Sequence, residues 1–266
     1  DLFFLRHTLV IVVSVASHLS NSPPVHFTVS FIISICAIIN RKTEKYQNNN
    51  IGISKNDTVF RINEREDLPM KNIILASGSP RRIEIMKDHG LDPEIRPEDV
   101  NENLPFYMTP EVSVMYLAFK KAVHTATLHY KPDSIYISAD TIVEYKGQII
   151  GKPHDSGDAF HTLHELRNDT HHVITGVCIL ETGSAQSSSP LQSFKRKECF
   201  YETTSVFFKD YSDDELLAYV NTAEPYDKAG GYAIQGTFGK YIDHIEGDYD
   251  NVVGFPWERI AALLKL

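Results

Sequence analysis

The stretch that decides the fold is "NIILASGSPRRIEIM", residues Asn72–Met86. It opens with a short apolar run, Asn72–Ala76, that ends in small residues, which is typical of a buried strand. Ser79 then occupies a favourable N-cap position. Pro80 takes the first helical position, where its missing N–H costs nothing. We therefore expect a strand, a tight turn and a helix that runs to about His89.

Further predicted strands and helices alternate toward the C-terminus. Strands are expected at Ser134–Ala139 with a continuation at Ile142–Tyr145, and at Gln148–Ile150, Val173–Leu180, Phe200–Phe208 and Tyr241–Ile245. Helices are expected from about Thr109, Ser156, Asp213 and Pro256. Two hairpin-like stretches interrupt the alternation, so the predicted class is α/β with strands of mixed direction.

Composition limits the function classes. The 266 residues carry a net charge of -9, which argues against a protein that wraps nucleic acid by charge alone. We therefore expect no nucleic-acid partner. The three cysteines (Cys36, Cys178 and Cys199) are scattered and odd in number, which fits a reducing compartment better than a disulfide framework. These features favour a cytoplasmic protein.

The N-terminal segment differs in composition from the rest. Leu2–Ser20 and Val25–Ile39 are apolar, but each is shorter than the roughly 20 residues that cross a bilayer. We expect residues 1–69 to be a disordered or non-native upstream extension, with Met70 as a natural start and 70–266 as one folded domain. The alternative is a signal anchor or targeting segment, and a membrane partner is expected only in that case. A peptide map of the native N-terminus separates these interpretations.

The turn that follows the first strand predicts an anion site. Ser77 and Ser79 flank a glycine at a helix start, where backbone N–H groups and the helix dipole attract negative charge. Arg81 and Arg82 add planar donors suited to phosphate oxygens. The arrangement favours a polyphosphate ligand. The alternative is an ordinary capped helix with solvated arginines.

Two acidic residues are candidates for catalysis. Asp140 directly follows an apolar run, so we expect it at the carboxyl end of a strand, where α/β ligand sites gather. A helix cap or turn is the alternative. Glu102 lies in "EDVNENLP", between two apolar segments. If the two carboxylates converge, they can hold a magnesium ion and activate a water for phosphate chemistry.

Three lysines and a glutamine complete the candidate set. A single lysine such as Lys121 is usually a solvated surface charge, but Lys152 and Lys228 lie beside glycines in tight loops. Gln235 is expected to end a short strand, and its amide both donates and accepts, which suits the edge of a base.

Other chemistries lack the residues that they need. The histidines His161, His164, His171 and His172 have no evident further ligands, so structural zinc is not supported. The chain has no Gly-x-Ser-x-Gly elbow and no Walker loop, so neither a hydrolase triad nor P-loop chemistry is expected.

Six motifs occur in the order seen in Maf proteins, which are nucleoside triphosphate pyrophosphatases. The resemblance covers nearly all of Met70–Leu266 and none of the leader. The motifs are SGSPRR at Ser77–Arg82, SADTIV at Ser138–Val143, GKP at Gly151–Pro153, HHVITGV at His171–Val177, EPYDKAGGYAIQG at Glu224–Gly236 and GDYDNVVGFP at Gly247–Pro256.

The resemblance implies a mixed, elongated, twisted sheet flanked by helices, as in inosine triphosphatase-like proteins, with two lobes, a central cleft and a homodimeric assembly. It implies hydrolysis of a nucleoside triphosphate to the monophosphate and pyrophosphate with Mg²⁺ or Mn²⁺. By position, Asp140 resembles the proton acceptor and Glu102 its acidic partner at the metal. Lys121, Lys152 and Arg82 resemble the cations that handle phosphate.

The resemblance also implies a substrate. Arg81, Thr141 and Gln235 follow the pattern of the branch that acts on dTTP and UTP, whereas the branch acting on 7-methyl-GTP has a bulky residue in place of the first arginine. Asn101 departs from the family pattern, since many relatives have Asp there, which weakens the case for a further carboxylate beside Glu102. The rival interpretation is a nucleotide-sensing regulatory module without turnover.

Overall fold

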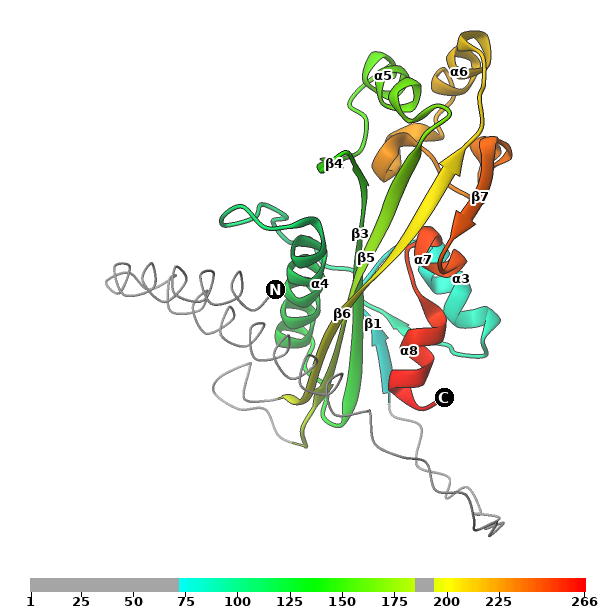
Figure 1. Cartoon of the computed structure of the whole chain (residues 1–266). Helices are drawn as coiled ribbons and strands as arrows, with labels where there is room; N and C mark the ends of the chain where they lie inside the picture. Colours follow the sequence, from blue (N-terminus) through cyan, green and yellow to red (C-terminus); the bar gives the residue numbers. More distant parts are fainter. Residues whose placement is uncertain (1–71, 185–193) are drawn as a thin grey trace, which may run out of the picture. The chain divides into compact units, whose positions relative to one another are not determined.

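The computed structural model describes residues 72–184 and 194–266, all within the compact unit Glu66–Leu266 (Figure 1). The predictions for the leader, residues 1–69, lie outside the described residues. In the part that is described, no helix is long and apolar enough to cross a membrane.

Seven strands form one sheet of mixed direction. The strand order is β2-β1-β3-β5-β6-β7, and β4 pairs with β3 off this path. Strand β1 runs parallel to β2 and β3, whereas the other pairs are antiparallel. The predicted mixed α/β class is therefore confirmed. The strands are β1 (Asn72–Leu75), β2 (Glu94–Ile95), β3 (Ser134–Tyr145), β4 (Gln148–Ile150), β5 (Thr170–Thr182), β6 (Phe194–Phe208) and β7 (Ile242–Glu246).

Helices flank the sheet. On one face α4 packs closely, because a Cβ on Gly176 would lie 2.3 Å from the backbone of Val114. On the same face Ser138 Oγ donates to Ala118 O at 2.5 Å. Helices α3, α7 and α8 lie on the other side in Figure 1. The helices are α3 (Pro80–Asp88), α4 (Pro110–Leu128), α5 (Ser156–Leu166), α6 (Asp213–Val220), α7 (Tyr249–Val253) and α8 (Trp257–Leu264).

One edge of β3 is interrupted. Strand β1 pairs with Ser134–Ile137 and β4 pairs with Val143–Tyr145 along this edge. Among the described strands none pairs with residues 138–142 there. The opposite edge of β3 pairs continuously with β5 from Ile135 to Glu144, so the strand does not break. The prediction that Asp140 ends a strand is therefore wrong, because β5 holds it in mid-strand beyond the end of β1.

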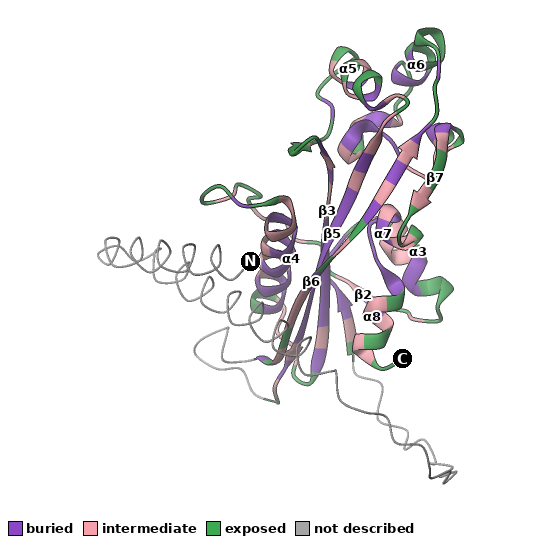
Figure 2. Cartoon of the chain, in the orientation of Figure 1, coloured by how far each residue is buried: buried purple, intermediate pink, exposed green. Residues whose placement is uncertain are grey.

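Buried residues lie along the strands of the sheet (Figure 2), and the buried apolar residues form two separate clusters. One is mainly aliphatic and includes Leu75, Met86 and Ile137. The other is rich in aromatic rings, among them Tyr219 and Phe238, whose centroids are 4.5 Å apart. The two cores correspond to the predicted lobes.

Local predictions differ from the structure at a few points. Gln235 lies in a turn rather than at a strand end, because its loop folds back toward Glu224. Strand β2 and helix α7 were not predicted, since each is too short to show a period. Cys178 and Cys199, which are scattered in the sequence, are direct cross-strand partners on β5 and β6 and both thiols are free.

Candidate active site

A cavity of about 660 Å³ opens at the interrupted edge of β3 and is lined by residues from both lobes. The structure brings all but one of the predicted site residues to it. The exception is Ser77, which contacts the lining residue Arg82. The predicted residues in the lining are Ser79, Arg81, Arg82, Glu102, Lys121, Asp140, Thr141, Lys152, Lys228 and Gln235. The role of each stays a prediction.

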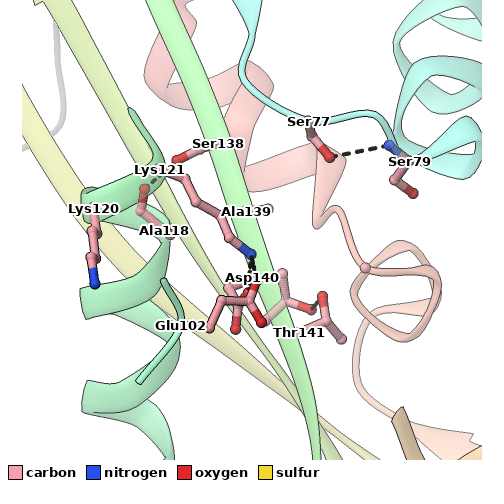
Figure 3. A network of polar contacts seen from close by, with 12 residues as sticks. Ser77, Ser79, Glu102, Ala118, Lys120, Lys121, Ser138, Ala139, Asp140 and Thr141 are labelled. Carbon is pink, nitrogen blue, oxygen red and sulfur yellow. Dashed lines mark hydrogen bonds and ion pairs between the residues drawn. The ribbon is translucent and has the colours of Figure 1, made fainter. Parts of the chain in front are cut away.

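An ammonium group joins the two predicted carboxylates. Lys121 Nζ on α4 lies 2.6 Å from Asp140 Oδ1 and 2.6 Å from Glu102 Oε1. Figure 3 shows the three side chains meeting beside β3. Asp140 is only 8% exposed, whereas the side chain of Glu102 is 60% exposed on the loop before α4. The carboxylates converge, as the sequence could not establish.

The surrounding charges favour the ionised form of Glu102. Partial burial acts to raise the pKa of its carboxyl group, but the hydrogen bond from Lys121 and the positive charges of Lys121, Lys152 and Arg82 outweigh it. The pKa of Glu102 therefore lies below its ordinary value, and the group is anionic at neutral pH.

Arg82 is partly buried and bonded mainly to protein. Its Nε donates to Gly254 O at 2.9 Å and its Nη1 to Ala139 O at 2.9 Å. The second bond supplies a donor to a backbone carbonyl on the interrupted edge of β3. Further bonds run from Nη1 to Ser77 Oγ at 3.0 Å and from Nη2 to Thr141 Oγ1 at 3.1 Å. Burial lowers the pKa of Arg82 to about 10 against the opposing charge of Asp140. Since a guanidinium has five N–H donors, one donor remains for a ligand.

The turn before α3 keeps part of its predicted anion-binding capacity. The Ser79 N–H donates to Ser77 Oγ at 3.3 Å, so this amide is already engaged. Ser79 occupies the N-cap position but its hydroxyl makes no capping bond. Ser79 is one of the residues that line the cavity.

A chain of hydroxyl groups behind the cavity was not predicted. Thr141 Oγ1 lies 3.0 Å from Thr175 Oγ1, which donates to Asn251 O at 3.0 Å. Asn251 Nδ2 donates in turn to Val173 O and Thr204 Oγ1. The motifs HHVITGV and GDYDNVVGFP contain Thr175 and Asn251, but only the pairing of β3 with β5 shows that they reach Thr141.

The segment 224–237, called here the 224–237 loop, forms the opposite wall. Gly230 has a φ of +70° and a Cβ there would lie 2.8 Å from Val143 Cγ2, so glycine permits this close approach. Lys228 Nζ donates to Glu224 O at 2.6 Å and pairs with Asp227 at 2.5 Å. The exposed Gln235 amide makes no hydrogen bond with any described residue, so it is available to a ligand.

Two of the predicted cationic side chains are not bonded to other described residues. Arg81 on the first turn of α3 and Lys152 on the β4–α5 loop line the cavity. Neither makes an ion pair or hydrogen bond with the residues that the structure describes. They can therefore turn toward an anionic ligand at little cost in broken bonds.

The two carboxylates also test whether the chain fits a divalent metal. No group of three or more His, Cys, Asp or Glu side chains among the described residues could hold one alone. Mg²⁺ at phosphate sites is commonly held by one or two carboxylates together with substrate phosphates. Asp140 and Glu102 each keep one oxygen that Lys121 does not use, and they fit this second mode.

Comparison with known proteins places the chain in a family. Residues 72–266 match the family described as Maf-like protein. A dTTP/UTP pyrophosphatase of Exiguobacterium sibiricum is 42% identical over 73% of this chain and 91% of its own length. A second, from Caldicellulosiruptor saccharolyticus, is 40% identical over 74% of this chain and 94% of its own.

Among solved structures, the Ham1 protein of Staphylococcus aureus aligns over 73% of this chain and 98% of its own, with 14% identity and a TM-score of 0.38. The sheet order above defines the fold independently of that alignment. The match over residues 72–266 and the relatives at about 40% identity show that the chain belongs to the Maf family.

Proposed function

We propose that this chain hydrolyses nucleoside triphosphates, with dTTP and UTP as preferred substrates, to the monophosphate and pyrophosphate. The names of the relatives support the reaction. Arg81, Thr141 and Gln235, which follow the dTTP/UTP pattern, all line the cavity. The biological role is then removal of surplus or modified pyrimidine nucleotides.

In this proposal the triphosphate lies between the start of α3 and α4. Arg81, Lys121 and Lys152 neutralise its charge from three sides, and the Ser79 hydroxyl donates to a phosphate oxygen. Lys228, which its own loop holds in place, adds a fourth positive charge on the opposite wall. The base lies toward the 224–237 loop, where the Gln235 amide reads its edge.

Asp140 is the proton acceptor. Its buried carboxylate takes a proton from the water that attacks the α-phosphorus, the bond to the bridging oxygen breaks and pyrophosphate leaves. Lys121 holds the Asp140 carboxylate in its orientation while the charge develops, so most of the catalysis is positioning and charge stabilisation. A Mg²⁺ or Mn²⁺ ion held by Asp140 and Glu102 would neutralise phosphate charge and help to activate the water.

The observation that carries this proposal is the buried Asp140 carboxylate, paired with Lys121 at 2.6 Å on the wall of a cavity rich in cations. Replacing Asp140 with Asn keeps the shape but removes the base. Pyrophosphate release from dTTP by D140N should fall at least about 10³-fold. The far-UV circular dichroism spectrum, which reports the secondary structure, should stay unchanged. Undiminished release would overturn the assignment. Nucleotide binding by the wild type without turnover would favour the regulatory module.

We also propose that the protein acts as a homodimer, as the family resemblance implies, and that it is cytoplasmic, as its cysteine usage favours. Light scattering behind a sizing column tests the assembly. Fractionation of native cells tests the location.

A further inference from the structure

The 224–237 loop contributes Lys228 and Gln235, among other residues, to the lining of the cavity, but it has little regular structure of its own. Its backbone forms the short 3-10 turns Pro225–Asp227 and Ala229–Gly231, and Gln235 lies in a turn beyond them. A segment of this kind has no strand ladder to fix it. The Gly230 N–H donates to Gly151 O at 3.0 Å and fixes the middle of the loop, and side-chain contacts add to the anchoring of its ends.

One carboxylate joins the two ends of this loop. Glu224 Oε1 accepts from the Thr237 backbone N–H at 2.9 Å, and Oε2 accepts from Thr237 Oγ1 at 2.6 Å. Gly236 makes room for this arrangement, because a Cβ there would lie 1.9 Å from Glu224 Oε1. Tyr219 OH also approaches Oε1, at 3.5 Å, from helix α6.

Glu224 also contacts Lys228, which lines the cavity. The backbone oxygen of Glu224 accepts from Lys228 Nζ at 2.6 Å. Glu224 is absent from the cavity lining, so it cannot contact a ligand there directly. Any effect of its side chain on the substrate must pass through the loop, and Gln235 is the nearest recognition group in sequence to the Gly236–Thr237 anchor.

We propose that Glu224 is a positioning residue for base recognition, which closes the 224–237 loop and thereby presents the Gln235 amide in a fixed orientation. The inference rests on the proposed function, since it names how that site selects its substrate. A loop fixed before binding loses less conformational entropy when the nucleotide arrives. Without the carboxylate, substrate binding itself must order the loop.

The test separates binding from turnover. Glu224→Ala should raise the KM for dTTP and UTP up to about fivefold, the effect expected when the Gln235 contact is lost altogether, and leave kcat within about twofold, because the groups around Asp140 do not touch Glu224. The preference for pyrimidine over purine triphosphates should shrink. Glu224→Gln should stay within about threefold of the wild-type KM, since its amide oxygen accepts from the Thr237 N–H and its NH₂ donates to Thr237 Oγ1.

A matched control lies in the same lobe. Glu215 accepts from Ser212 N at 2.9 Å and from Ser212 Oγ at 3.0 Å in the capping box of α6, away from the cavity lining. Glu215→Ala removes a comparable carboxylate and should lower the unfolding midpoint with KM unchanged. If Glu224→Ala behaves in the same way, its role is merely structural and the inference is overturned.

Two further measurements keep the outcome decisive. If Glu224 acts through Gln235, adding Glu224→Ala to Gln235→Ala should raise KM less than it does alone; strictly multiplicative effects would contradict that route. If Glu224→Ala does not fold, Thr237→Val removes one of the two bonds and should raise KM about threefold; an unchanged KM would again overturn the inference. A wild type that releases no pyrophosphate from any triphosphate refutes the proposed function instead.

Discussion

The two sides of the cavity hold their polar groups in different ways. On the sheet side, Arg82, Lys121 and Asp140 lie on helices and a strand, and each is already bonded to protein. On the loop side, the Gln235 amide is unengaged within the described residues, and its segment is fixed at the ends by Glu224. The bonded groups Arg82, Lys121 and Asp140 are thus built into regular elements, whereas the recognition group Gln235 is left free on a closed loop. Changes on the sheet side should alter kcat and stability, and changes on the loop side should alter KM and selectivity.

The largest effect is expected for Lys121→Met. This change removes the ammonium group that lies 2.6 Å from both Asp140 and Glu102, so two carboxylates face the incoming phosphates without it. We expect kcat for pyrophosphate release to fall about 10³-fold, or about 4 kcal/mol in activation free energy. Steady-state kinetics with dTTP measures this.

Lys120→Met is the control for that change. Lys120 is the neighbouring lysine on α4 and donates to the Asn101 carbonyl, outside the cavity lining. The kcat of the Lys120→Met variant should stay within about threefold of the wild-type value. Equal losses in both variants would mean that the sheet side responds to net charge rather than to the Lys121 bridge.

The next largest effect is expected for Arg82→Lys. Arg82 links three separate segments through Ser77, Ala139 and Gly254, and a single ammonium group cannot span these acceptors. Buried acceptors left unpaired should lower the free energy of unfolding by about 3 kcal/mol. Urea denaturation measures it. Arg81→Lys, at a position without such bonds, should cost less than about 0.5 kcal/mol. Equal costs would contradict the linking role of Arg82.

The sheet side also shows how far sequence alone reaches. The strand, turn and helix from Asn72 were predictable because Pro80 and the apolar run are local signals. The resemblance to the family implied that the lysines, arginines and acids share one site, but the residues alone did not show that Asp140 and Glu102 converge. That Arg82 donates mainly to protein was not predictable, because its partner Ala139 lies 57 residues away. The Ala139 carbonyl needs a side-chain donor because no described strand pairs with β3 at this point of its edge.

The two wrong predictions have a common cause. Asp140 was placed at a strand end, since a polar residue follows an apolar run, but pairing with β5 carries the strand through it. Gln235 was expected to end a short strand, but it lies in a turn, where the next residues of the chain bind the Glu224 carboxylate. In both cases a partner distant in sequence overrides the local preference.

A smaller effect concerns the anchoring of the loop side at low pH. His171 is fully buried, with Nε2 2.5 Å from Tyr232 OH and Nδ1 without a hydrogen-bond partner among the described residues. Burial, with a further contribution from the charge of His172, lowers the pKa of His171 from 6.5 to about 3, against the opposing charge of Asp169. Between these values the unfolded chain binds a proton that the folded chain does not. Stability should therefore fall as the pH drops below 6.5.

At pH 5 this loss is about 2 kcal/mol relative to neutral pH. His171→Gln should remove most of it in urea unfolding measured at pH 5 and pH 7. Carboxylates with lowered pKa, such as Glu102, lose their stabilising charge below their ordinary value of 4.5 and contribute little at pH 5. An unchanged slope in His171→Gln would contradict the prediction.

The smallest effect is expected for Gln235→Ala, and it separates the two sides most directly. The variant removes one amide that has no protein partner among the described residues, so nothing in the fold depends on it and the unfolding midpoint should not move. Loss of one hydrogen bond to a neutral base costs about 1 kcal/mol, which corresponds to a KM for dTTP raised about fivefold with kcat unchanged. Kinetics with dTTP and with a purine triphosphate should show that only the pyrimidine loses affinity. A fall in kcat as large as that of Lys121→Met would mean that the loop takes part in the chemistry, and the division between the two walls would not hold.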